Sequence, residues 1–307
     1  MGIFKQFGLV AIALLLGLAF SSCGENPVPG NSQSNDTVPP ESSNAEKPVT
    51  ELNMAIIPSV SSEKQKEDIQ QLEEYLTKTL SLPVKISLTK DYEESINLLV
   101  EGKVEIAYLG PFSYIQAKER NPNLEPLVAH IEKSTARPWY SSVIVVNTAA
   151  GINNLEDLKG KRFGFVSKSS TSGFLVPSAH FKEMKIEPER DFAAVEYAGG
   201  HDKNLEALIA GKVDAIAVDQ LTYVQFFQAG KLPEEKYKLI WESNPIPNSP
   251  IVISSELPSE LKTQLQIAFI NAPEGLANVG GVRASGYTAV RDEDYDLIRQ
   301  IQKSLAE

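Results

Sequence analysis

A run of hydroxyl side chains, Ser169-Ser170-Thr171-Ser172-Gly173, has the composition of an anion-binding turn. It follows an apolar segment that ends near Val166 and precedes a helical pattern that starts near Gly173. Hydroxyls and free backbone N–H groups at the start of a helix form a neutral cradle for a tetrahedral oxyanion, and the helix dipole favours negative charge there. A helix cap would need only one hydroxyl, so the surplus favours binding. The P-loop pattern GxxxxGK[ST] is absent, which excludes that kind of nucleotide site.

Ionisable residues near the ends of predicted strands are the next candidates. His201 follows a Gly-Gly turn after a strand and opens a helix, a position that suits a ligand contact and a plain helix start equally well. His130, in the apolar run LVAHI, is interpreted as a strand residue with satisfied hydrogen bonds, and His180 as a mid-helix residue without special neighbours. In VDAIAVD, Asp214 begins the strand and Asp219 ends it. Only Asp219 is therefore expected at the sheet edge that carries the hydroxyl turn and His201.

Short apolar runs alternate with helical periodicity from Leu52 onward and supply the elements that would position these residues. The predicted strands are LNMAII, PVKISLT, VEIAYL, SVIVVN, RFGFV, FAAVEYA and VDAIAV, and later KLIWES and SPIVIS. The predicted helices span about 63–80, 92–101, 173–184, 202–210, 221–229, 258–271 and 292–305. This alternation is typical of βαβ units and predicts largely parallel sheets flanked by helices.

These elements predict two α/β lobes. Residues 50–146 and 238–307 are expected to form the first lobe, and residues 147–237 the second lobe, inserted in the first. Two strands that cross between the lobes would form a hinge, and the crevice between the lobes would face helix N-termini.

Several segments together resemble a known family. They are DYEESINLLVEGKVEIAYLGPFSY, WYSSVIVV, LKGKRFGFV, SSTSGFLVPS, VEYAGGHDKNLEALIAGKVDAIAVD and PIPNSPIVI, and they cover roughly residues 52–290 in order. The chain resembles the substrate-binding components of bacterial phosphate, phosphite and phosphonate ABC importers. The resemblance implies a type II periplasmic-binding fold that closes on a phosphorus oxyanion and delivers it to the permease subunits. A monomer without a cofactor or a metal is expected.

The resemblance assigns ligand contacts to seven side chains: Tyr92, Tyr140, Ser170, Thr171, Ser172, His201 and Asp219. Without the resemblance, Tyr92 would be interpreted as an ordinary aromatic residue at a helix start, and Tyr140 as an ordinary aromatic residue in a strand. Asp219 could accept a hydrogen bond from a P–OH group and would repel an oxyanion that lacks this proton, such as sulfate. A single carboxylate favours a ligand without an amine. Phosphite, methylphosphonate, phosphate and a larger phosphonate all stay open.

Composition limits the alternatives. The 307 residues carry a formal net charge of −11, so general attraction to nucleic acid or anionic lipid is excluded. A ligand-binding protein that serves a sensor, and an enzyme on the same scaffold, are the rival functions. The sequence has no GxSxG elbow, no HExxH motif and no cysteine after position 23, and Lys168 is the one lysine at the hydroxyl turn. These absences disfavour catalysis.

The single cysteine, Cys23, follows an apolar stretch from Phe7 to Phe20 that fits an export signal. Phe20-Ser21-Ser22-Cys23 resembles a bacterial lipobox, with Phe20 where Leu is usual. Residues 1–22 are therefore predicted to be a lipoprotein signal peptide, and Cys23 to be lipidated. The alternative is a plain signal peptide with a bystander cysteine. Residues 23–49, rich in Pro, Ser, Asn and Gly, are predicted to form a disordered tether. The protein is expected at a cell membrane, on its periplasmic or extracellular face.

Overall fold

The computed structural model describes residues 49–60, 63–133, 135–281 and 283–307. The predicted signal peptide, Cys23 and all of the predicted tether except Val49 lie outside these residues. The described residues belong to one compact unit, Glu46–Glu307. No helix among them is both long enough and apolar enough to cross a membrane.

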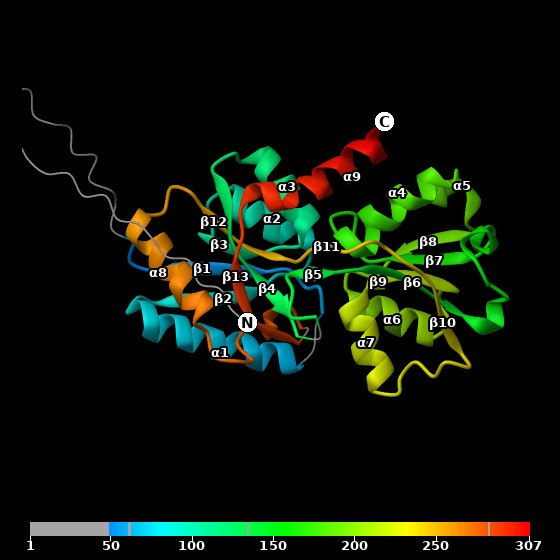
Figure 1. Ribbon diagram of the computed structural model, residues 1–307, viewed down its shortest axis with the longest axis horizontal. Helices are drawn as coiled ribbons and strands as arrows, with labels where there is room; N and C mark the ends of the chain where they lie inside the picture. The colour runs from blue at the N-terminus through cyan, green and yellow to red at the C-terminus, as the bar shows by residue number, and fades with distance from the viewer. Residues whose placement is uncertain (1–48, 61–62, 134, 282) are drawn as a thin grey trace, which may run out of the picture. The chain divides into compact units, whose positions relative to one another are not determined.

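A six-stranded sheet carries the first group of elements (Figure 1). Its strands, in spatial order, are β13 (Ala284–Ala289), β4 (Leu124–Glu132), β12 (Pro250–Ser254), β3 (Ile106–Tyr108), β1 (Leu52–Ile56) and β2 (Val84–Leu88). The helices that accompany it are α1 (Glu63–Leu80), α2 (Tyr92–Val100), α3 (Pro111–Arg120), α8 (Ser259–Ile270) and α9 (Asp296–Ala306). Both ends of the described chain contribute to this sheet, as the sequence predicts.

A five-stranded sheet carries the second group. Its strands, in spatial order, are β10 (Tyr237–Glu242), β6 (Ser142–Asn147), β9 (Ala215–Asp219), β7 (Arg162–Phe165) and β8 (Ala194–Tyr197). Helices α4 (Val176–Glu183) and α5 (Pro188–Asp191) lie on one face, and α6 (His201–Ile209) and α7 (Gln220–Gln228) on the other (Figure 1). Alternate residues of β6 enter different apolar clusters, Ile144 and Val146 one and Val143 and Val145 the other. Burial of both faces explains the unbroken apolar run SVIVV.

The α/β class and the two-sheet architecture are confirmed, but the expectation of mostly parallel sheets is wrong. Strand β1 pairs parallel with β2 and β3, and β7 pairs parallel with β8 and β9. The other ladders, β3–β12, β12–β4, β4–β13, β9–β6 and β6–β10, are antiparallel. Helical crossovers produce the parallel pairs. The chain passes from one large sheet to the other between β4 and β6, and back between β10 and β12. Each of these antiparallel pairs contains at least one of these four strands, and β13, from the last part of the chain, pairs with β4.

Two short strands, β5 (Trp139–Tyr140) and β11 (Ile246–Pro247), form an antiparallel pair on the two segments that connect the large sheets. They occupy the place of the predicted two-strand hinge. The predicted boundaries at 146/147 and 237/238 fall at the ends of β6 and β10, which both belong to the five-stranded sheet. The sheet pairing therefore favours boundaries nearer β5 and β11, and the division into two domains stays a prediction.

The last helix, α9, makes a further link between the two groups of elements. It packs against α3 of the first group and α4 of the second (Figure 1). The Lys182 ammonium on α4 donates to the carbonyl oxygens of Ser304 and Leu305, at 2.9 and 3.1 Å. Near the other end of α9, Asp292 bonds both Tyr114 on α3 and Arg299.

Candidate ligand-binding site

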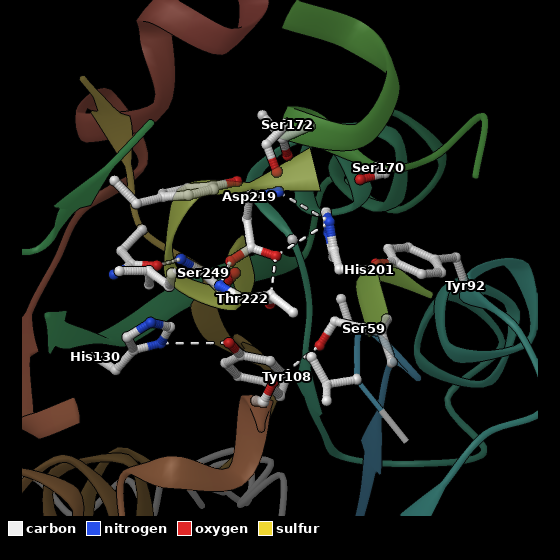
Figure 2. Close-up of a pocket in the computed structure, with 18 residues that line it drawn as sticks. Ser59, Tyr92, Tyr108, His130, Ser170, Ser172, His201, Asp219, Thr222 and Ser249 are labelled. Carbon is white, nitrogen blue, oxygen red and sulfur yellow. Dashed lines mark hydrogen bonds and ion pairs between the residues drawn. The ribbon is translucent and has the colours of Figure 1, made fainter. Parts of the chain in front are cut away.

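A small pocket, with a volume of about 40 Å³, is lined by residues of both large sheets and of the connecting strand β5 (Figure 2). All seven side chains predicted as ligand contacts line it: Tyr92, Tyr140, Ser170, Thr171, Ser172, His201 and Asp219. A cavity of this size holds about three water molecules. It is therefore matched to a small ion and not to a nucleotide or a sugar.

The hydroxyl turn opens the helix that leads into α4. Ser170 is the N-cap, and its Oγ accepts a hydrogen bond from the Gly173 N–H at 3.1 Å. Residues Thr171–Leu175 form a π-helical turn, where the sequence predicted an ordinary α-helix from Gly173. Turns of this kind are frequent at functional sites. A Cβ on Gly173 would lie 2.4 Å from the Val166 side chain, so the turn requires glycine.

Hydrogen bonds to helix α3 fix the hydroxyl turn and leave several of its donors available to the pocket. Thr171 Oγ1 accepts from the backbone N–H of Phe112 at 2.9 Å, which leaves its own proton free to donate. Ser113 Oγ donates to the Ser169 carbonyl at 2.7 Å, so helix α3 holds the turn from the six-stranded side. The backbone N–H groups of Thr171 and Ser172 have no acceptor among the described residues. The Thr171 hydroxyl and these two amides are thus available to an anion.

Asp219 has two roles in the structure. Its carboxylate caps helix α7, accepting from the N–H and the hydroxyl of Thr222, each at 2.7 Å, and it also lines the pocket with only 6% of the residue exposed. Asp214, the competing carboxylate, lies at the other end of strand β9 and pairs with Arg162 at 2.6 Å. The choice of Asp219 over Asp214 for this sheet edge is confirmed.

His201 lies directly against Asp219 (Figure 2). Its Nδ1 accepts from the Asp219 backbone N–H at 3.0 Å and lies 3.1 Å from Asp219 Oδ2. Burial lowers the pKa of His201, and the negative charge of Asp219 opposes this shift. A neutral imidazole that accepts at Nδ1 carries its proton on Nε2, so His201 is a further neutral donor. Its backbone N–H donates to the Ser59 carbonyl at 2.7 Å, which ties α6 to the six-stranded side of the pocket.

The two predicted tyrosines are buried in the pocket wall, with 2% of Tyr92 and 9% of Tyr140 exposed. Tyr92 opens helix α2, and Tyr140 lies in β5. Burial raises the pKa of both phenols, and the charge of Asp219 adds to the shift. Hydroxyls of the turn, Ser170 beside Tyr92 and Ser172 beside Tyr140, oppose it. Both phenols therefore keep their protons at neutral pH and can donate.

Apart from Tyr92, the sequence did not predict the residues on the six-stranded side of the pocket. Tyr108, His130, Asn248 and Ser249 line this side. The interpretation of His130 as fully satisfied is wrong, because its Nδ1 lies 3.3 Å from the Tyr108 hydroxyl and its Nε2 has no partner among the described residues. A histidine inside the run LVAHI and the polar pair inside PIPNSPIVI were the available signals.

The remaining histidine lies outside the pocket. His180 stacks on Trp241, with ring centroids 4.8 Å apart, and its Nδ1 is 3.3 Å from Glu183. Within the described part of the chain, no group of His, Cys, Asp and Glu side chains is arranged to hold a metal ion.

Burial of His130 predicts a pH-dependent stability. Desolvation lowers its pKa to about 4, against the opposing charges of Asp219 and Glu132. The unfolded chain, with a pKa near 6.5, takes up a proton first as the pH falls, so the stability contribution is complete above pH 6.5 and is lost toward pH 4. At pH 5 the expected loss is about 2 kcal/mol.

Urea unfolding at pH 7 and pH 5 measures this loss. The His130→Phe variant keeps the stack on Tyr108 and should lose about 2 kcal/mol less stability than the wild type between these pH values. Equal losses in the two proteins would contradict the assignment.

Comparison with known proteins identifies the family. The family described as "ABC transporter, phosphonate, periplasmic substrate-binding protein" matches residues 54–295. The chain belongs to this family of phosphonate-binding proteins. It is a periplasmic substrate-binding component of an ABC importer for phosphonate, phosphite or phosphate, and it is a binding protein, not an enzyme.

Two relatives support the assignment along most of the chain. The phosphate-import protein PhnD of Mycolicibacterium smegmatis is 30% identical over 282 residues, which is 85% of this chain and 88% of that protein. The phosphonates-binding periplasmic protein of Escherichia coli is 30% identical over 266 residues, 84% of this chain and 77% of its own length.

Solved structures of this family share the fold. The binding protein component of an ABC phosphonate transporter from Pseudomonas aeruginosa superposes with a TM-score of 0.74 at 26% identity, over 83% of this chain and 86% of the other. PhnD1 of Prochlorococcus marinus, solved with methylphosphonate, gives a TM-score of 0.75 at 19% identity, over 84% and 98% of the two chains. At that identity the likeness concerns the fold alone.

Proposed function

We propose that this phosphonate-binding protein captures a small phosphorus oxyanion in the pocket and that the seven predicted side chains hold it. Phosphate, phosphite and a small phosphonate such as methylphosphonate form the ligand class. The observation that carries the proposal is the convergence of neutral donors on a buried pocket of about 40 Å³ that contains a single carboxylate. The relatives named for phosphate import and for phosphonate binding support the same class.

Neutral donors suffice for an anion in this setting. No Lys or Arg is among the described residues that line the pocket. The amides and hydroxyls of the turn, the Tyr92 and Tyr140 phenols and His201 Nε2–H can all point protons at the ligand oxygens. Such bonds to a charged oxygen are about twice as strong as those between neutral groups. An acidic protein can therefore bind an anion without a counter-charge.

Asp219 sets the chemical requirements on the ligand. A carboxylate beside an oxyanion is repulsive unless the ligand brings a proton, which a P–OH group does and sulfate at neutral pH does not. Asp219 is the single carboxylate among the described lining residues, and its oxygens already accept from Thr222. The remaining acceptor sites can serve one P–OH group. The described lining residues offer no second carboxylate to hold a ligand ammonium, so a ligand without an amine is expected.

Titration calorimetry of the purified protein tests the class directly. The panel is phosphate, phosphite, methylphosphonate, an aminoalkylphosphonate and sulfate. At least one of the first three should bind with a micromolar or tighter Kd, and sulfate and the aminoalkylphosphonate should bind far more weakly. Failure of all three phosphorus oxyanions to bind would overturn the proposal.

Delivery to the permease and attachment to the membrane complete the proposed function. The two groups of elements would close on the ligand about β5 and β11 and present it to the transmembrane subunits. Diacylation of Cys23 and acylation of its amino group would supply two or more lipid chains, enough for stable anchoring.

Cys23→Ala should release the protein from the membrane fraction, because no acyl chain can be attached to the alanine. Cell fractionation and intact-mass measurement check this, with Ser34→Ala as a control that leaves the cysteine in place. A wild-type protein that is fully soluble and carries no acyl mass would contradict the anchor.

A further inference from the structure

Two buried nitrogen atoms on the six-stranded side of the pocket have no hydrogen-bond partner among the described residues: His130 Nε2 and Asn248 Nδ2. Both residues line the pocket, and each is only 2% exposed. Unsatisfied buried donors are uncommon in proteins because each costs the full desolvation of the group. Two of them on one wall indicate that the ligand is their partner.

The identity of each free atom follows from its neighbours. Asn248 Oδ1 accepts from the Ser249 N–H at 2.9 Å, so the amide nitrogen is the free end. Burial raises the pKa of the Tyr108 phenol, and its contact with Ser249 only partly offsets this, so the phenol keeps its proton. The phenol lies 3.3 Å from His130 Nδ1 (Figure 2). With the phenol as the donor in this contact, the imidazole proton lies on Nε2.

We propose that His130 and Asn248 form a second oxyanion subsite, and that this protein selects a phosphorus ligand with four oxygens, inorganic phosphate, over those with three. The inference rests on the proposed function. The turn, His201 and Asp219 surround the ligand from the five-stranded side. His130 and Asn248 face it from the six-stranded side, so donors stand on both sides of one tetrahedral ion.

The number of oxygens decides how well these groups are satisfied. Phosphate presents an oxygen at each vertex of the tetrahedron. Phosphite and methylphosphonate present a P–H or a P–CH₃ at one vertex. This vertex can accept no hydrogen bond and, when it faces His130 and Asn248, leaves both donors unpaired. Loss of a hydrogen bond to a charged group corresponds to roughly tenfold or more in affinity. Sulfate also has four oxygens, but it lacks the proton that Asp219 requires.

Calorimetric titration of the full mature protein with phosphate, phosphite and methylphosphonate tests the selectivity. Phosphate should bind about tenfold or more tightly than either of the others. His130→Phe keeps the ring stack on Tyr108 and removes the free donor. Asn248→Leu has a similar volume and removes the free donor without adding a charge. Each variant should weaken phosphate binding about tenfold and leave methylphosphonate binding within about twofold, so that the preference shrinks or disappears.

Matched controls come from outside the pocket. His180→Phe, at the residue that stacks on Trp241, and Asn153→Leu, at an exposed position, should leave all three affinities unchanged. A wild type that binds methylphosphonate or phosphite as tightly as phosphate would overturn the second subsite while the proposed function stands, and so would variants that weaken all three ligands equally. A wild type that binds none of the three would overturn both.

Discussion

Thr171→Ala should weaken binding of the phosphorus oxyanion by about 10- to 150-fold, the range of one hydrogen bond to a charged group. Thr171 is 2% exposed and lines the pocket. Its Oγ1 is oriented by the Phe112 N–H, so the hydroxyl proton is directed away from that amide and is available to the ligand. Removal of the hydroxyl also leaves the Phe112 N–H without its acceptor, so the free energy of unfolding should fall by about 1 kcal/mol.

Titration calorimetry and urea unfolding separate the two effects of this substitution. Thr171→Ser keeps the hydroxyl and should restore most of both the affinity and the stability. Thr263→Ala, on an exposed face of α8, should change neither the affinity nor the stability. If the alanine variant at position 171 binds every phosphorus oxyanion with the wild-type Kd, the turn is only a helix cap.

Asp219→Asn should change the selectivity of the pocket. Asn can still cap α7 through its side-chain oxygen, since Asn and Asp are equally good N-caps, so folding should be nearly unaffected. A ligand that donates a P–OH to the carboxylate should bind about 10-fold or more weakly, because the amide can present N–H groups where an acceptor is needed. Sulfate, no longer repelled by the negative charge, should begin to bind.

Affinities for phosphate, phosphite, methylphosphonate and sulfate, measured for wild type and for Asp219→Asn, check this prediction. The Asp214→Asn variant is the matched control, because Asp214 pairs with Arg162 at the far end of the same strand. Identical ranking and affinities in wild type and Asp219→Asn would assign the carboxylate to helix capping alone and place selectivity elsewhere.

The five-stranded side of the pocket was predictable from the sequence because its groups follow consecutive strands and helix starts. The hydroxyl turn follows β7, His201 opens the helix after β8, and Asp219 ends β9. These three strands are mutually parallel, and parallel strands bring their carboxyl ends to one edge. The rule that placed Asp219 and excluded Asp214 therefore holds for this part of the molecule.

Apart from Tyr92, the residues on the six-stranded side of the pocket were not predicted, because they come together through antiparallel pairing. Tyr108 in β3 lies opposite Ile251 in β12, and β12 lies beside β4, which carries His130. Strand β12 is more than a hundred residues from both β3 and β4 along the chain, and no local pattern fixes its register with them. Helix α3, whose N-terminal residues hold the hydroxyl turn, was also not predicted as a helix, although its segment was part of the family resemblance.

The contact of α9 with α4 limits the movements that could open the pocket. A chain that crosses between two bodies only at β5 and β11 could both bend and twist there. Lys182 and the last carbonyls of α9 form a third attachment. It lies away from the axis through β5 and β11 and restrains rotation about that axis. Twisting would break it, whereas a lysine on a flexible stem can follow a short slide of one helix along the other. Under the closure proposed above, the last turn of α9 is expected to move with ligand capture, which makes it a suitable place for a spectroscopic reporter and a poor one for a bulky group.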